Sequence, residues 1–403
     1  MSGRPAQCAR HVRSPPPATD LDPTAPTADA VPAASAVGER LLVAAEEKRS
    51  RNYLRQLGRV GPWAVAVVPL IYLLNLASDR LMSVTPDGAT VLLEGQSIAT
   101  GNVALRGWAL SLDSFWGIDA AFYALAVRLV GLRVDLLHIV PALLAALVIV
   151  VAVGLAVQGR RGPAAGVAAG VVVALLALPS PDLAYYLLQG PWHIGTALYC
   201  LLAFYGLGRG RFDWGFALAV LLLALGLLSD LLILGFGVLP CLVAGGVATL
   251  RCRRWRAGMP TILGGLASVA LALGLRELTQ AIGSFTLVNR NLVVRAPQMQ
   301  ANLSHLGNRL SGLLGFGSIT LGPFDDGSSA SRLLHLLGLV AVSLGLLAGL
   351  VAMTRGIFTG ASRQRGSSQL WRIEDLLCFA ILGDLATFVL DSPNGHSEYV
   401  KYR

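Results

Sequence analysis

The chain has 403 residues, of which 54% are hydrophobic and only 14% are charged. A soluble domain carries about 25% charged residues, so this composition excludes an ordinary soluble enzyme. The net charge of +9 does not indicate a nucleic-acid partner, because the basic residues cluster between apolar segments, as at Arg251, Arg253, Arg254 and Arg256. A membrane surface explains that placement better.

Residue usage adds two expectations. Lysine occurs only at positions 48 and 401, while Arg, Ala, Gly and Leu are abundant. This bias is typical of GC-rich coding and predicts a bacterial source. None of the five cysteines has a neighbour at metal-ligand spacing. We therefore expect the cysteines to serve as small apolar side chains in the core, at Cys8, Cys200, Cys241, Cys252 and Cys378.

The N-terminal region carries no span. Residues 1–37 are rich in Pro, Ala, Thr and Asp without an apolar period, which predicts a disordered cytoplasmic tail. They lack the apolar core of a signal peptide, so the first span is not expected to be cleaved off. Residues 38–59 fit a basic amphipathic helix lying on the cytoplasmic leaflet, with a plain solvated helix as the alternative.

Residues 60–390 are predicted to form an all-α, polytopic transmembrane bundle of about nine spans. Long outer segments are expected at 80–136 and 276–331, and an outer C-terminal segment at 391–403. The sequence leaves open whether the chain continues beyond Arg403. The stretch 115–131 carries Asp119 and Arg128, which favours a helix lying at the outer interface. The spans are predicted at 61–79, 137–157, 162–180, 192–208, 214–229, 231–250, 258–275, 332–353 and 373–390.

Loop charges orient these spans. With a cytoplasmic N-terminus, the short outer loops at 181–191 and 230 contain no Lys or Arg. The positive-inside rule therefore predicts a multi-pass protein of the bacterial inner (cytoplasmic) membrane, with its N-terminus cytoplasmic. Every inner loop contains arginine, namely 158–161, 209–213, 251–257 and 354–372.

Glycines recur every four residues in two spans, at positions 162, 166 and 170 and again at 345 and 349. Such stripes let helix backbones approach closely in lipid. We expect them to serve packing within the protein, not dimerisation.

Polar residues near apolar spans are the candidates for chemistry, because burying them in lipid is costly. The carboxylates and imidazoles gather on the outer side in this orientation. One carboxylate there could act as a general base, and several together could hold a divalent cation. The alternative is ordinary solvated loop residues, although Asp230 has almost no loop to keep it in water. The candidates are Asp87, Glu94, Asp113, Asp119, His138, His193 and Asp230, with Asp384 in the outer half of the last span.

Residues 84–150 contain an ordered set of features. An acidic residue, Asp87, opens the outer segment; the run 110–116 (LSLDSFW) follows; and the stretch 122–131 ends before the next span. This order resembles the start of the C-type membrane glycosyltransferases, which include protein O-mannosyltransferases and aminoarabinose transferases. The resemblance implies a polyprenyl-phosphate-linked sugar donor, an outer-face active site and inversion at the sugar. The family's catalytic aspartate maps to Asp87.

The resemblance implies roles for the other candidates. Glu94, Asp113 or Asp119 would assist acceptor or metal binding, with His138 near the substrate, and His193 and Asp230 would contact the phosphate. The sequence departs from the family where Gly88 replaces the usual Glu and where His-Pro-Pro is absent. These departures leave open a non-catalytic membrane scaffold or inactive relative; a transporter or flippase is a second alternative.

Overall fold

The computed structural model describes the chain over 67–111, 113–158, 160–177, 179, 181–191, 193–287, 296–313, 340, 343–345, 347–351, 354–355 and 368–390. The chain divides into two compact units, Met1–Ala64 and Val65–Arg403, and all of the described residues belong to the second. The predictions for residues 1–37, 38–59 and 391–403, and for most of the span at 332–353, lie outside the described residues.

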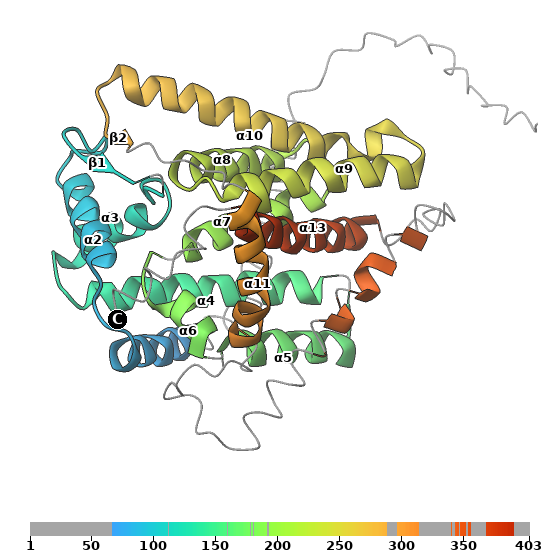
Figure 1. Ribbon diagram of the computed structural model, residues 1–403, viewed down its shortest axis with the longest axis horizontal. Helices are drawn as coiled ribbons and strands as arrows, with labels where there is room; N and C mark the ends of the chain where they lie inside the picture. Colours follow the sequence, from blue (N-terminus) through green and yellow to red (C-terminus); the bar gives the residue numbers. More distant parts are fainter. Residues whose placement is uncertain are drawn as a thin grey trace, which may run out of the picture. The chain divides into compact units, whose positions relative to one another are not determined.

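The described part is mostly helical (Figure 1). Two short parallel strands, β1 (Ala109–Leu110) and β2 (Thr286–Leu287), pair with each other. A helix over 67–81 comes first. The other helices are α2 (Pro86–Ala99), α3 (Asp119–Val130), α4 (Leu136–Val157), α5 (Pro163–Ala177), α6 (Pro181–Leu188), α7 (Ile194–Gly208), α8 (Trp214–Ser229), the π-helical η2 (Leu234–Val238), α9 (Leu239–Cys252), α10 (Trp255–Ala281), α11 (Ala296–Leu313) and α13 (Ser368–Leu390).

Three helical segments in the described part are long and apolar enough to cross a membrane: Leu136–Val157, Leu234–Cys252 and Trp255–Ala281. Each approaches or exceeds the roughly 20 residues that a hydrocarbon core requires. The helices α5, α7 and α8 are apolar but shorter. The structure therefore supports a helical protein with membrane-spanning segments, whereas the predicted number of nine spans is not confirmed.

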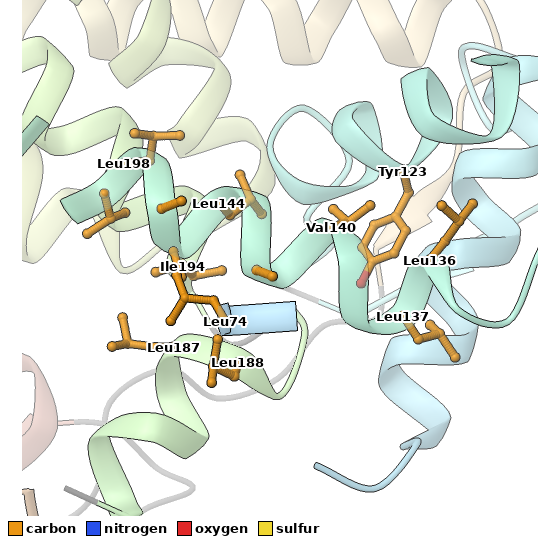
Figure 2. Close-up of a cluster of buried hydrophobic side chains, with 14 of the residues drawn as sticks. Leu74, Tyr123, Leu136, Leu137, Val140, Leu144, Leu187, Leu188, Ile194 and Leu198 are labelled. Carbon is orange, nitrogen blue, oxygen red and sulfur yellow. The ribbon is translucent and has the colours of Figure 1, made fainter. Parts of the chain in front are cut away.

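One apolar core surrounds α4. Figure 2 shows Tyr123 of α3 pointing towards Leu136, Leu137 and Val140 in the first turns of α4. Farther along the same helix, Leu144 lies in a cluster with Leu187 and Leu188 of α6, Ile194 and Leu198 of α7, and Leu74 of the first helix. This core joins α2 and α3 to the bundle.

A second core joins α7, α8, α9 and α13 through residues such as Phe204, Leu223, Ile233 and Leu376. Glycines allow its helices to approach closely. A Cβ at Gly206 of α7 would meet the backbone of Gly215 in α8, and one at Gly258 of α10 would meet that of Gly245 in α9. These close contacts replace side-chain packing along the two seams.

One end of the bundle collects basic turns around the start of α13. Arg160, after α4, lies 4.0 Å from Glu374, and Arg251 at the end of α9 forms a two-pronged ion pair with Asp375 at 3.0 Å. A Cβ at Gly208, the last residue of α7, would meet the side chain of Ile373. Three of the four predicted inner loops therefore adjoin one another.

The opposite end carries α2, α3, β1 and β2, which lie together at the left of Figure 1. Phe285, just before β2, packs with Leu105 and Leu110 beside β1. The segment that follows was predicted to be a long outer loop, but it contains α11, whose Asn302 donates a hydrogen bond to the carbonyl of Val389 in α13 at 3.0 Å. The outer loop predicted at 181–191 likewise contains α6.

Two expectations on packing were wrong. Arg251 was assigned to the membrane surface, but its side chain is buried, because the carboxylate of Asp375 neutralises it there. The glycine stripe of α5 was expected to pack internally. Within the described residues, however, a Cβ at Gly162, Gly166 or Gly170 would meet nothing within 4 Å.

Candidate functional site

The most concentrated polar group of the described residues lies where α7 begins and α8 ends. Nδ1 of His193 is 2.7 Å from Oδ2 of Asp230, and the hydroxyl of Thr196 donates to the same oxygen at 2.5 Å. The amide of Leu232 donates to Oδ1 at 3.0 Å. The carboxylate of Asp230 is 0% exposed, whereas the ring of His193 is 28% exposed. An imidazole held by a buried carboxylate therefore presents one edge outward.

Local backbone conformation places both side chains. Asp230 ends α8 in an extended conformation, and its side chain closes the turn into η2 by accepting from Leu232. His193 precedes α7 in the left-handed conformation, with φ of 63°. Non-glycine residues rarely adopt that region, and when they do they are concentrated at functional sites.

Hydrogen bonds connect this site to the chain between β1 and α3. The amide of Gly117 donates to the hydroxyl of Ser229 at 2.8 Å, and the amide of Phe115 donates to the Ser229 carbonyl at 3.0 Å. The Tyr199 hydroxyl donates to the Gly117 carbonyl at 3.0 Å. The ring of Phe115 lies 5.4 Å from that of His193. The segment ahead of α3 is therefore anchored directly beside the imidazole.

Asp119 adds a second buried carboxylate. It begins α3, is 1% exposed, and contacts Gly195 in the first turn of α7, where a Cβ would meet its carboxylate. Among the described residues, neither carboxylate oxygen has a hydrogen-bond partner of normal geometry. Burial raises the pKa of Asp119 to about 7; Asp230 adds to the rise, while His193 and the nearby amides of Asp119 and Gly195 oppose it. Only glycine at position 195 leaves room for this approach.

The carboxylates set the charge of the imidazole. Burial by itself would lower the pKa of His193, but the adjacent Asp230, with Asp113 and Asp119, raises it to about 9. Burial by itself would raise the pKa of Asp230, but His193 and the hydrogen bonds from Thr196 and Leu232 outweigh it and lower that pKa. His193 is therefore an imidazolium at neutral pH, facing an ionised Asp230.

Glu94 lies apart from this pair, between α2 and α3. It is 2% exposed, and its Oε2 has no hydrogen-bond partner in the described structure. Burial raises the pKa of Glu94 to about 8, so it is largely neutral at pH 7. Its neighbour Gly95 packs on the Cβ of Tyr123, whose buried hydroxyl also has no hydrogen-bond partner in the part of the chain that the structure describes.

The remaining candidates lie elsewhere. Asp87 is exposed in the first turn of α2, and its neighbour Gly88 packs near Leu137 of α4. No contact within the described residues joins Asp87 to His193. The Nδ1 of His138 is 3.0 Å from the hydroxyl of Ser78, which donates to the carbonyl of Leu188. The structure thus brings Asp113, Asp119, His193 and Asp230 together and leaves Asp87, Glu94 and His138 outside that group.

Sequence reasoning missed the groups that hold the pair in place. Thr196 donates to Asp230, the hydroxyl of Ser229 accepts from the amide of Gly117, and the ring of Phe115 lies beside that of His193. Ser229 directly precedes Asp230, and Thr196 follows His193 by three residues, within one helical turn. That spacing was the available signal, but it becomes informative only once α7 and α8 are known to be neighbours.

The arrangement can bind an anion at the exposed part of His193, since the imidazolium carries positive charge and lies at the N-terminus of α7. No group of three or more His, Cys, Asp or Glu side chains among the described residues is placed to hold a metal ion.

Comparison with known proteins found no relative of this chain. No family model matches the chain, and neither the curated proteins nor the solved structures contain a match to it.

Proposed function

We propose that the protein is a glycosyltransferase of the C-type membrane class. It transfers a sugar from a polyprenyl-phosphate donor to an acceptor hydroxyl at the outer face of a bacterial cytoplasmic membrane. The observation that carries the proposal is the His193–Asp230 pair, which holds an imidazolium at the end of the bundle opposite the basic turns. Under the positive-inside rule that end faces outward.

The reaction assigns separate tasks to the residues. The acceptor oxygen attacks the anomeric carbon, the bond from that carbon to the phosphate oxygen breaks, and the phosphate leaves with the electron pair. The charge of His193 stabilises the leaving phosphate, and Asp230 keeps the ring charged and oriented. Asp87, exposed in α2 and matching the family's catalytic position, accepts the acceptor's proton. Asp119 is buried and acts through His193.

The test is transfer by the purified full chain in lipid nanodiscs, with a panel of polyprenyl-phosphate-linked hexoses and pentoses and with release of polyprenyl phosphate as the readout. Asp87→Asn should abolish transfer while leaving donor binding intact. His193→Gln should weaken donor binding and slow transfer by about 100-fold or more, as for loss of one charge-stabilising group. Equal insertion and thermal stability of both variants is the control.

A non-catalytic scaffold is the second candidate, because the contacts of Asp230 with His193, Thr196 and Leu232 are also normal structural bonds within the bundle. A scaffold predicts no turnover of any donor by the wild-type chain. It also predicts that His193→Gln lowers only the unfolding midpoint. Normal transfer by Asp87→Asn would reject Asp87 as the base.

A further inference from the structure

A groove at the basic end of the bundle lies among α4, α5, α7 and α13 and has a volume of about 280 Å³. Its wall is formed mainly by apolar side chains, including Leu155, Val172, Leu201 and Leu377. Two charged side chains also line it, Arg160 and Glu374.

The volume and lining suit an aliphatic chain. Dry apolar cavities of about 150 Å³ bind a benzene molecule, so this groove accommodates a longer hydrocarbon segment. It is lined by α4, which is long and apolar enough to span a membrane, and by the shorter apolar helices α5 and α7. Apolar walls of this kind interact favourably with acyl chains and with no polar metabolite.

The charged side chains indicate which lipid headgroup would accompany the aliphatic chain. The side chains of Arg160 and Glu374 are 39% and 47% exposed and lie 4.0 Å apart. An ion pair so exposed and so long contributes little, so the guanidinium can exchange Glu374 for a phosphate. The neighbouring turns give this end an excess of positive charge, carried by Arg161, Arg209, Arg211, Arg253 and Arg254 against Asp213.

We propose that this groove binds an anionic glycerophospholipid, with one acyl chain between α4, α5, α7 and α13 and its phosphate on Arg160. The lipid comes from the leaflet at the basic end, which is the end opposite His193. The site is therefore separate from the proposed donor site, and it does not depend on any transferase activity. Its occupant ties α13 to α4 and α5 across a groove that the described side chains do not fill.

The experiment is native mass spectrometry of the full chain, delipidated in detergent and titrated with phosphatidylglycerol or with phosphatidylcholine of identical acyl chains. We expect wild type to retain phosphatidylglycerol preferentially. Arg160→Gln should weaken this retention by about tenfold or more, since one charge-assisted hydrogen bond corresponds to at least that factor. Ala156→Phe, which fills the groove, should reduce retention of both lipids.

Two matched controls accompany these variants. Arg161→Gln removes an adjacent charge that does not line the groove, and Gly154→Phe adds the same ring at a position of α4 where a Cβ meets nothing within 4 Å of the described structure. Both should bind like wild type. If Arg160→Gln and Arg161→Gln lost phosphatidylglycerol retention equally, the effect would come from diffuse surface charge. If wild type retained the two lipids equally, the contact between Arg160 and the phosphate would be rejected. Either result overturns the proposal.

Discussion

Single carboxyl groups in this chain behave differently according to what packs around them. Asp230 is buried and ionised because an imidazolium and two hydrogen-bond donors face it. Glu94 is equally buried, but burial raises its pKa to about 8 because its Oε2 has no such partner. Their residue types are almost the same, so the difference comes entirely from neighbours that are distant in sequence.

The raised pKa of Glu94 predicts that the stability of the folded protein depends on pH. The unfolded chain releases this proton near pH 4.5 and the folded chain near pH 8, so stability falls as pH rises between those values. Glu94→Gln lacks the titration. Its advantage over wild type should grow by at most about 1.4 kcal/mol per pH unit across that window and then level off.

Thermal unfolding in detergent between pH 4.5 and 9 measures this difference. Gln96→Ala, an uncharged replacement in the same helix, is the control and should shift stability by the same amount at every pH. A gain for Glu94→Gln that is constant with pH would show that the carboxyl group is not held neutral in the folded protein.

At the scale of the helix, apolar runs predicted most segments well. The spans predicted at 137–157, 192–208 and 214–229 coincide closely with α4, α7 and α8. The helix predicted within 115–131 is present as α3, while its position at the outer interface stays a prediction. The predictions failed for α6 and α11, which were assigned to loops. Their sequences lack a long apolar run, and α11 in particular is held against α13 by contacts that no local pattern records.

Of the two predicted glycine stripes, the one in α5 meets nothing within 4 Å in the described part of the chain, whereas a Cβ at Gly349 of the other would meet Cys378 of α13. The closest seam, between α9 and α10, depends on Gly245 and Gly258, whose backbones are in contact. A small residue permits close approach, but only the partner helix determines whether that approach occurs.

Gly258→Ala should therefore destabilise the protein by about 1–3 kcal/mol through overpacking, in spite of the better helix propensity of alanine. Gly246→Ala is the matched control, because a Cβ there meets nothing within 4 Å in the described part. It should be neutral or slightly stabilising. Unfolding midpoints of the two variants in the same detergent measure the difference, and equal midpoints would contradict the close seam.

Over the whole bundle, charge is segregated between two ends. Arg160, Arg251 and the end of α7 converge on the start of α13, while His193, Asp230 and Asp119 occupy the opposite end. The ion pair of Arg251 and Asp375 joins residues 124 positions apart and is buried. A buried pair costs desolvation, but breaking it leaves one charge uncompensated.

Arg251→Met or Asp375→Leu alone should each destabilise the protein by about 3–5 kcal/mol, because the remaining charge stays buried without its partner. The double variant should recover most of that loss, since two apolar side chains can replace the pair. Arg253→Met, in the next turn, should have little effect. Unfolding midpoints of wild type, the two single variants and the double variant form the cycle, and additive losses in the double variant would show that the two residues act independently.

Composition and local sequence patterns were enough to predict that the chain is helical, apolar enough for a membrane, and patterned with arginine on alternate loops. These properties are local, since they depend on composition and on runs of neighbouring residues. Which polar residues lie together became clear only from the packing of the helices. That packing joined His193 to Asp230 and Arg251 to Asp375, buried Asp119 against Gly195, and left Asp87 exposed in α2. The reason is that the energy of a charge depends on its partner and its exposure, and helix packing sets both.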